Sequence, residues 1–286
     1  MKKLIALVLT VVLALSITAG FADGIKIAVP NDPTNEGRAL LLLQAYGLLT
    51  IKEEAGILAT AADVIDNPLG ITFEEVEAAN VPNIVADVDY AIINGNYALA
   101  ASEAGINLNV LLYENAESPY VNVVSVKDEN KDSDIAKALA AAVQSQKIVD
   151  FFARYEAGEG QVQPVCVIEN PTDGYDPTVD YDALKGTEFK VACTLDPHSY
   201  VLGIAKEILG EKGISLDVVL VEDYVTPNLM TDAGDVFANF FAHQPYQDSF
   251  NAENGTNLVT IAGVHVEPMG LYAGKQADLS ALGLGE

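Results

Sequence analysis

The amino-acid sequence predicts a two-lobed α/β protein in which each lobe is a sheet flanked by helices. In both halves of the chain, short apolar runs typical of strands alternate with stretches whose apolar residues follow a helical period. An acidic segment with several prolines and glycines separates the halves. The 286 residues are enough for two lobes of ordinary domain size. Such alternation is typical of parallel strands covered by helices.

The first half contains three predicted strands, which are the apolar runs Ile25–Val29, Tyr90–Ile93 and Val110–Tyr113. A helix is predicted to begin near Thr34 or Asn35, where a hydroxyl or amide side chain is available as N-cap. Residues 133–152 have the pattern of one long amphipathic helix, because their apolar positions lie four apart.

The second half repeats the pattern. In chain order we expect a strand over Phe189–Cys193, a helix over Ser199–Leu209, a strand over Leu216–Val221, a short helix over Thr226–Met230 and a strand over Val236–Phe241. Between the halves, residues 156–186 hold seven acidic residues against one lysine and show no sustained period. This composition predicts an irregular connector. Two lobes joined by a connector predict a cleft, where small-molecule sites usually form.

The first residues have the pattern of a secretory signal peptide. Two lysines precede an apolar run from Leu4 to Leu15, and the small residues Gly20 and Ala22 stand before a predicted cleavage at Asp23. The alternative is a retained membrane anchor, but the run is shorter than the roughly 20 residues that span a bilayer. We expect an exported protein, periplasmic or extracellular, and association with the cell surface is left open. No cysteine near the cleavage site offers a point for lipid attachment.

Composition excludes several classes of protein. The formal net charge is −26, with 41 acidic against 15 basic residues, which argues against binding to nucleic acid or to an anionic membrane. Half of the residues are hydrophobic, so the chain is not a disordered one. The two cysteines, Cys166 and Cys193, lack metal-ligand spacing. Because Cys193 ends an apolar run, a buried thiol is favoured and a disulfide is the alternative.

The segment Asn31–Arg38 is the first candidate site. It follows a strand and opens a helix, so free backbone N–H groups lie at the carboxyl end of a sheet and favour an anion such as a substrate carboxylate. Arg38, one turn into the helix, is suited to bind the same carboxylate with two hydrogen bonds. The alternative is a capped helix in which Arg38 is solvated or paired with a neighbouring acid.

The segment Phe237–Tyr246 is the second candidate, because it combines aromatic residues with His243 directly after a predicted strand. Aromatic walls suit an apolar or thioether side chain. Phe237 and Phe240 are expected in the core. The amides of Asn94, Asn96 and Asn122 are suited to an α-ammonium group, or else they complete turns.

We predict neither an enzyme nor a cofactor. The sequence has no Gly-x-Ser-x-Gly, no glycine-rich phosphate loop and no His-Glu-x-x-His. The only histidines besides His243 are His198 and His265, and none has metal-ligand spacing, so no metal site is predicted.

At these residues the sequence resembles the methionine-binding lipoprotein family, the NlpA-type substrate-binding proteins of methionine ABC importers. One matching stretch ends near Phe152 and contains IAVPNDPTN at residues 27–35, AIIN at 91–94 and ESPYVN at 117–122. The other begins at Val191 and contains DYVTPN at 223–228, FAHQPY at 241–246 and EPMGLY at 267–272. Together the two stretches cover most of the chain.

In the family the second stretch comes first, so the sequence resembles a circular permutant. Residues 156–186 would then join the old carboxyl end to the old amino end, and permutation is tolerated when termini lie close together. We expect residues 277–282 to pack against the lobe that begins at Ile25. The predicted division is a signal peptide at 1–22, a first lobe at 23–118 with 276–286 packed on it, and a second lobe at 119–155 and 187–275.

The resemblance implies a type II periplasmic-binding-protein-like fold and capture of methionine, by hinge closure, for an ABC-importer permease. It implies that Arg38 holds the ligand carboxylate, and that Asn94 and Asn122 bind its amino and carboxylate groups. The side-chain pocket would be lined by Tyr224, Phe241, His243 and Tyr246, with Asn35 and His198 as further ligand-binding residues. We expect a monomer. The alternatives are a methionine-containing dipeptide or another apolar amino acid as ligand, or an extracellular interaction protein without a transport role.

Overall fold

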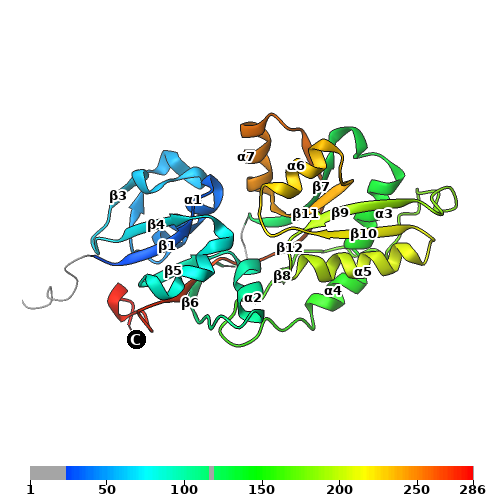
Figure 1. The fold of residues 1–286 in the computed structure, drawn as a ribbon. Coiled ribbons are helices and arrows are strands. Elements are labelled where there is room, and N and C mark those ends of the chain that lie inside the picture. Colours follow the sequence, from blue (N-terminus) through cyan, green and yellow to red (C-terminus); the bar gives the residue numbers. More distant parts are fainter. Residues whose placement is uncertain (1–23, 116–118, 286) are drawn as a thin grey trace, which may run out of the picture.

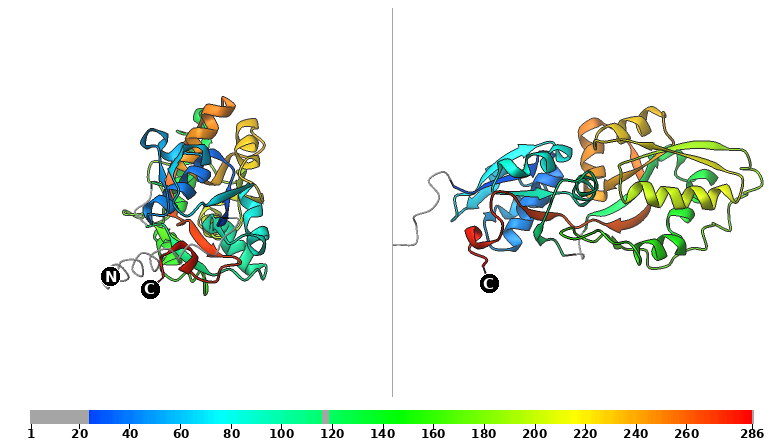
Figure 2. Two further views of the ribbon diagram at one scale, coloured as in Figure 1. Left: turned by 90° about the vertical axis from the view of Figure 1, so that its left-hand side faces the viewer. Right: turned by 60° about the horizontal axis from the view of Figure 1, so that its bottom comes forward.

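The computed structural model describes residues 24–115 and 119–285, and it consists of two α/β lobes that lie side by side (Figures 1 and 2). The predicted signal peptide at 1–22 lies outside the described residues. Within the described part of the chain, no helix is long and apolar enough to cross a membrane. The predicted two-lobed α/β class is confirmed, with helices flanking a sheet in each lobe.

The first lobe is built on a five-stranded sheet. Its order is β4 (Thr72–Val76), β1 (Lys26–Pro30), β5 (Tyr90–Ile93), β13 (Gly270–Ala273) and β6 (Val110–Tyr113). Its helices are α1 (Pro33–Ala45) and α2 (Gly95–Glu103), with a 3-10 segment at Ala78–Asp87 and a small hairpin of β2 (Thr50–Ile51) and β3 (Val64–Asp66). β1 is parallel to β4 and β5, whereas β13 is antiparallel to both of its neighbours. The expected all-parallel sheet is therefore wrong, and the sheet is mixed.

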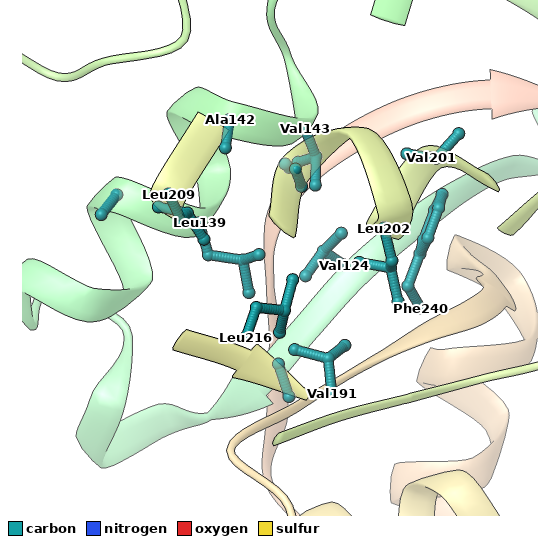
Figure 3. Close-up of a cluster of buried hydrophobic side chains, with 14 of the residues drawn as sticks. Val124, Leu139, Ala142, Val143, Val191, Val201, Leu202, Leu209, Leu216 and Phe240 are labelled. Carbon is teal, nitrogen blue, oxygen red and sulfur yellow. The ribbon is translucent and has the colours of Figure 1, made fainter. Parts of the chain in front are cut away.

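The second lobe is built on a six-stranded mixed sheet. Its order is β10 (Ser215–Leu220), β9 (Glu188–Cys193), β11 (Ala238–His243), β7 (Val121–Lys127), β12 (Leu258–Val266) and β8 (Val165–Cys166). Its helices are α3 (Asp134–Val143), α4 (Gln146–Phe152), α5 (His198–Gly210), α6 (Thr226–Ala233) and α7 (Gln244–Asn254). Helices α3 and α5 pack on one face of the sheet, where Leu139, Leu202 and Phe240 form a buried core (Figure 3).

The predicted single helix over 133–152 is wrong, because it ends at Val143 and a second helix begins at Gln146. The break has a local cause. The backbone N–H of Gln146 donates to the carbonyl of Thr172, and the N–H of Thr172 donates to the carbonyl of Gln144. These bonds with a distant segment replace those that would continue the helix, and a periodicity in one stretch of sequence does not reveal them.

The predicted boundary of the second lobe at 275 also needs correction. Strand β13 pairs along one edge with β5 and along the other with β6, so it belongs to the first lobe. The chain crosses between the lobes at about Glu267–Met269, directly after β12, and Figure 2 shows this crossing in red-brown. The apolar runs of β12 and β13 follow one another closely, and strand pairing alone assigns them to different sheets.

The carboxyl-terminal segment packs on the first lobe. Leu282 is 3% exposed in the same hydrophobic cluster as Ile25, and the hydroxyl of Tyr90 donates to the carbonyl of Asp278. Residues 277–282 thus make the contact that a circular permutant requires. Both cysteines are free thiols, with Cys193 buried.

The connector is more ordered than an irregular linker. It contributes β8 to the second sheet, and Val179 is buried in the core of the second lobe. Just before it, the hydroxyl of Tyr155 donates to Asp196, which lies in the loop between β9 and α5. Asp196 is 4% exposed, and burial raises the pKa of its carboxyl group to about 6 although the bond from Tyr155 opposes this effect.

A raised carboxyl pKa makes a pH-dependent contribution to stability. In the folded protein Asp196 keeps its proton up to about pH 6, whereas an unfolded Asp loses it near 3.8. The free energy of unfolding of the wild type should therefore fall, by roughly 2–3 kcal/mol, as the pH rises through this interval. Asp196→Asn should remove this fall, as measured by urea unfolding between pH 4 and 7. The exposed Asp217→Asn is the control, and an unchanged pH profile in Asp196→Asn would contradict the prediction.

Candidate functional site

A small cavity lies between the two lobes. It is tight, with a free volume of about 10 Å³. Eight of the nine predicted ligand-binding residues line it, namely Asn35, Arg38, Asn94, Asn122, Tyr224, Phe241, His243 and Tyr246. His198 does not line it. The structure therefore brings together residues that are far apart in the sequence and that belong to both lobes.

Three strand–helix junctions carry most of these residues. In α1, Asp32 caps the helix by accepting from the N–H of Asn35, and Pro33 occupies the first turn. α2 begins after β5, and α7 begins after β11 with His243 as N-cap. Register places the remaining amide, because Asn122 in β7 stands opposite His243 of β11 and His265 of β12.

Arg38 is 3% exposed and is already paired within the protein. Its Nε donates to both carboxylate oxygens of Glu114, at 2.9 and 3.0 Å, and its Nη2 donates to Glu114 Oε2 at 2.6 Å and to the carbonyl of Glu267 at 2.7 Å. Its guanidinium carbon lies 4.3 Å from the centre of the Tyr120 ring. The alternative of pairing with an acid is therefore realised, and a ligand carboxylate has to approach the guanidinium from its Nη1 side.

The charge of Arg38 is secure in this setting. Burial opposes the charged form, but the attraction of Glu114 outweighs it and raises the pKa of the guanidinium above its ordinary value. A buried, permanently charged group beside a cavity is suited to an anion such as a carboxylate.

Asn35 links the two lobes inside the site. Its Oδ1 accepts from Asn94 Nδ2 at 2.8 Å and lies 3.1 Å from Nε2 of His243, which belongs to the second lobe. The Nδ1 of His243 accepts from the N–H of Tyr246, so Nε2 carries the proton and donates to Asn35. Burial and the nearby charge of Arg38 lower the pKa of His243 well below its ordinary value, so the ring is neutral. The Oδ1 of Asn94 is buried and has no hydrogen-bond partner among the described residues.

His198 lies behind Asn122 rather than in the cavity, so its predicted contact with the ligand is not supported by its position. Its Nε2 lies 3.2 Å from Asn122 Oδ1, and its Nδ1 lies 3.1 Å from the hydroxyl of Thr194. The groups next to Nε2 are acceptors, so this nitrogen carries the proton and donates to Asn122. The Nδ2 group of Asn122 is thereby left as the donor for a ligand.

Glu267 also lines the cavity, and the sequence analysis did not single it out. It is 6% exposed, and its Oε1 accepts from His265 Nε2 at 2.8 Å and lies 3.5 Å from His198 Nε2. Burial raises the pKa of its carboxyl group. The available signal was its place among the apolar residues VHVEPMGL, where a charged residue needs a reason. Glu114, the partner of Arg38, was missed as well and has no local signal.

The rest of the wall is aromatic. The ring of Tyr224 lies 5.8 Å from that of Phe241 and 5.9 Å from that of Tyr246. The Tyr224 hydroxyl donates to Asn96 Oδ1 of the first lobe at 2.6 Å. The Asn96 oxygen is therefore already bonded within the protein. Such a wall suits an apolar or thioether side chain, for which sulfur–ring contacts each contribute about 0.3–1.5 kcal/mol.

His198, His265 and Glu267 form the one cluster of potential metal ligands in the described part of the chain, with ligand atoms within 4.8 Å of one another. No metal site was predicted from the sequence. The Nε2 atoms that face Glu267 carry protons in this hydrogen-bond network, so metal binding would require their removal. We therefore interpret the cluster as a set of hydrogen bonds that hold Asn122 and Glu267 in place.

A larger groove lies elsewhere between the lobes. It has a volume of about 690 Å³ and is lined by residues of α2, α4 and α5, among them Glu103 and Phe151, and by Tyr155 and Asp196 from the adjoining loops. None of the predicted ligand-binding residues lines it. The small cavity is the better candidate site, because buried polar groups of both lobes converge on an apolar wall there.

Comparisons with known proteins agree with this description. The family model described as NlpA lipoprotein matches residues 16–166 and 189–286. A probable D-methionine-binding lipoprotein MetQ of Pasteurella multocida is 42% identical over 130 residues, 44% of this chain and 45% of that protein. The D-methionine-binding lipoprotein MetQ of Escherichia coli K12 is 40% identical over 132 residues, 45% of this chain and 48% of that protein.

The crystal structure of a methionine-binding protein MetQ is 38% identical and covers 46% of this chain and 54% of its own, with a TM-score of 0.41. The chain thus spans about half the length of the curated relatives it matches. The two segments matched by the family model, in contrast, include every residue that lines the small cavity. The chain belongs to the NlpA lipoprotein family.

Proposed function

We propose that this protein captures methionine between its lobes and delivers it to the permease of an ABC importer, without doing chemistry itself. The observation that carries the proposal is the cavity, where a buried guanidinium and an aromatic wall face the same small space. A carboxylate would bind Arg38 and Asn122, and a thioether side chain would lie against Tyr224 and Phe241. Two relatives that match parts of this chain are named for D-methionine binding, which supports the ligand.

Hinge closure is the mechanism that we propose for capture. Direct hydrogen bonds cross the cleft from His243 Nε2 to Asn35 Oδ1, from the hydroxyl of Tyr224 to Asn96 Oδ1 and from the hydroxyl of Tyr97 to the carbonyl of Glu222. Each bond would exchange for water on opening, at a net free energy of about 0.5–1.5 kcal/mol. A ligand that contacts both lobes would add to this small bias and favour the closed state.

The tight cavity favours a small ligand. Its free volume is only about 10 Å³, so the lobes must move apart to admit an amino acid, and a methionine-containing dipeptide would require them to remain further apart. The role of a non-transport interaction protein finds less support. Burying a charge costs free energy, and a protein without a polar ligand would gain nothing from a charge beside its cavity.

Calorimetry tests the proposal most simply, with the mature protein titrated with L-methionine, D-methionine, leucine and Gly-Met. Arg38→Ala should weaken methionine binding by on the order of 100-fold, because a buried carboxylate would lose its charged partner. Arg154→Ala removes the other arginine of the chain, whose side chain is 80% exposed, and should leave the affinity unchanged.

A second variant guards against loss of folding, since Arg38→Ala leaves Glu114 unpaired. The double variant Arg38→Met/Glu114→Gln removes both charges and should fold yet fail to bind methionine. Methionine affinity equal to that of the wild type in this variant would show that Arg38 does not hold the carboxylate. No heat from any ligand with the wild type would contradict the proposed function.

We also propose that the chain is an exported monomer whose two family segments stand in reversed order. The half-length matches support this order, because an alignment that runs in one direction covers only one of two exchanged segments. The gap in the family match, at residues 167–188, falls almost wholly within the connector. The packing of Leu282 beside Ile25 supports it further.

Restoring the family order tests this proposal. A rearranged chain would start at Pro164, pass from Gly285 to Gly24 through a short glycine linker, and end at Gln163. It should fold and bind methionine as the original does, because Gln163 is exposed and the joined ends belong to one lobe. Circular dichroism and calorimetry provide the readouts. An insoluble or unfolded product would count against the permuted order.

A further inference from the structure

We propose that Glu267 is the counter-ion of the ligand's α-ammonium group, so that the site selects zwitterionic amino acids over simple carboxylic acids. The inference rests on the proposed function and adds the group that recognises the amino end of the ligand. Glu267 lines the cavity together with Arg38, and these are the two acidic or basic residues among those that line it.

The balance of charge is the first argument. The positive charge of Arg38 is already matched by Glu114, through the hydrogen bonds from Nε and Nη2. In its ionised form Glu267 adds a second negative charge, so these three groups then sum to −1, and burial raises the pKa of its carboxyl group as long as no cation lies beside it. A ligand with only a carboxylate would raise this to −2 in a buried space. A zwitterion adds no net charge and places a cation where Glu267 needs one.

The histidines beside Glu267 do not neutralise it. Burial lowers the pKa of His265 to about 3 and that of His198 to about 4, so both rings are uncharged near neutral pH. His265 still donates a hydrogen bond from Nε2 to Glu267 Oε1 at 2.8 Å. The ring thus holds the carboxylate in place and leaves its charge uncompensated. His265 is a positioning residue in this account.

The backbone also fixes Glu267. A Cβ atom on Gly95 would lie 2.8 Å from the Cβ of Glu267, a distance shorter than real contacts, so only glycine permits this approach. Gly95 begins α2 directly after Asn94, whose buried Oδ1 has no partner among the described residues. The Asn94 oxygen is a second acceptor at the same cavity. An ammonium group offers three N–H donors and would use both oxygens.

The test compares methionine with 4-(methylsulfanyl)butanoate, which is methionine without its amino group. We expect the wild type to bind methionine at least 100-fold more tightly at pH 7.5. In Glu267→Gln, methionine affinity should fall by a similar factor, whereas the desamino compound should bind as well as before or better. The exposed Glu253→Gln in α7 is the matched control and should keep the wild-type ratio.

Each outcome decides something. Equal wild-type affinities for the two compounds would overturn the inference without any variant, which covers the case that Glu267→Gln does not fold. An unchanged ratio in a folded Glu267→Gln would also overturn it, and would indicate that Glu267 is protonated in the site. A wild type that binds neither compound would overturn the proposed function itself. His265→Ala should lower the ratio partly, since it releases the carboxylate without removing it.

Discussion

The buried guanidinium of Arg38 constrains how the two lobes are joined. A charge removed from water needs close partners, and breaking such a pair typically costs about 3–5 kcal/mol. Its partners are Glu114, which follows the last strand of the first lobe before the chain crosses, and the carbonyl of Glu267, which lies where the chain crosses back. The N–H of Glu114 donates to the carbonyl of Met269, and the N–H of Met269 donates to the carboxylate of Glu114. Compensating one charge therefore ties these two crossings to helix α1.

Around this centre, weaker contacts join the lobes across the cleft, among them hydrogen bonds and the ring contact of Tyr97 with Tyr224 at 4.8 Å. The bonds across it join amides, hydroxyls and a neutral imidazole, so water replaces them at little cost when the lobes separate. The hydrophobic cores lie within the individual lobes and do not cross the cleft. Each lobe thus has a hydrophobic core of its own. Under the proposed function, binding energy from a ligand would shift the population toward closure.

The sequence predicted the local features well, because their causes are local. β1, β5 and β9 are short apolar runs, and α1 begins where Asp32 and Pro33 supply a cap and a first turn. The pairing of strands is not local. β13 follows β12 by a few residues yet joins the other sheet, and the bonds of Thr172 divide one expected helix into two. Periodicity carries no information about such partners.

Family resemblance and residue chemistry together predicted most of the residues that line the candidate cavity. Arg38, Asn94, Asn122 and His243 meet at one cavity although they are far apart in the chain. His198 does not line the cavity and lies behind Asn122, and the sequence does not distinguish a histidine behind an amide from one beside it. Glu114 escaped notice among 41 acidic residues because no local signal sets it apart, whereas the apolar neighbours of Glu267 in the sequence were a signal that was not used.

A crystal structure of the protein grown with L-methionine would test the central claim most directly. The account predicts ligand density in the small cavity, with carboxylate oxygens at hydrogen-bond distance from Arg38 and Asn122. The sulfur should lie against Tyr224 and Phe241, with Glu114 still paired to Arg38. Density in the larger groove beside Asp196, with the small cavity unchanged, would contradict the account.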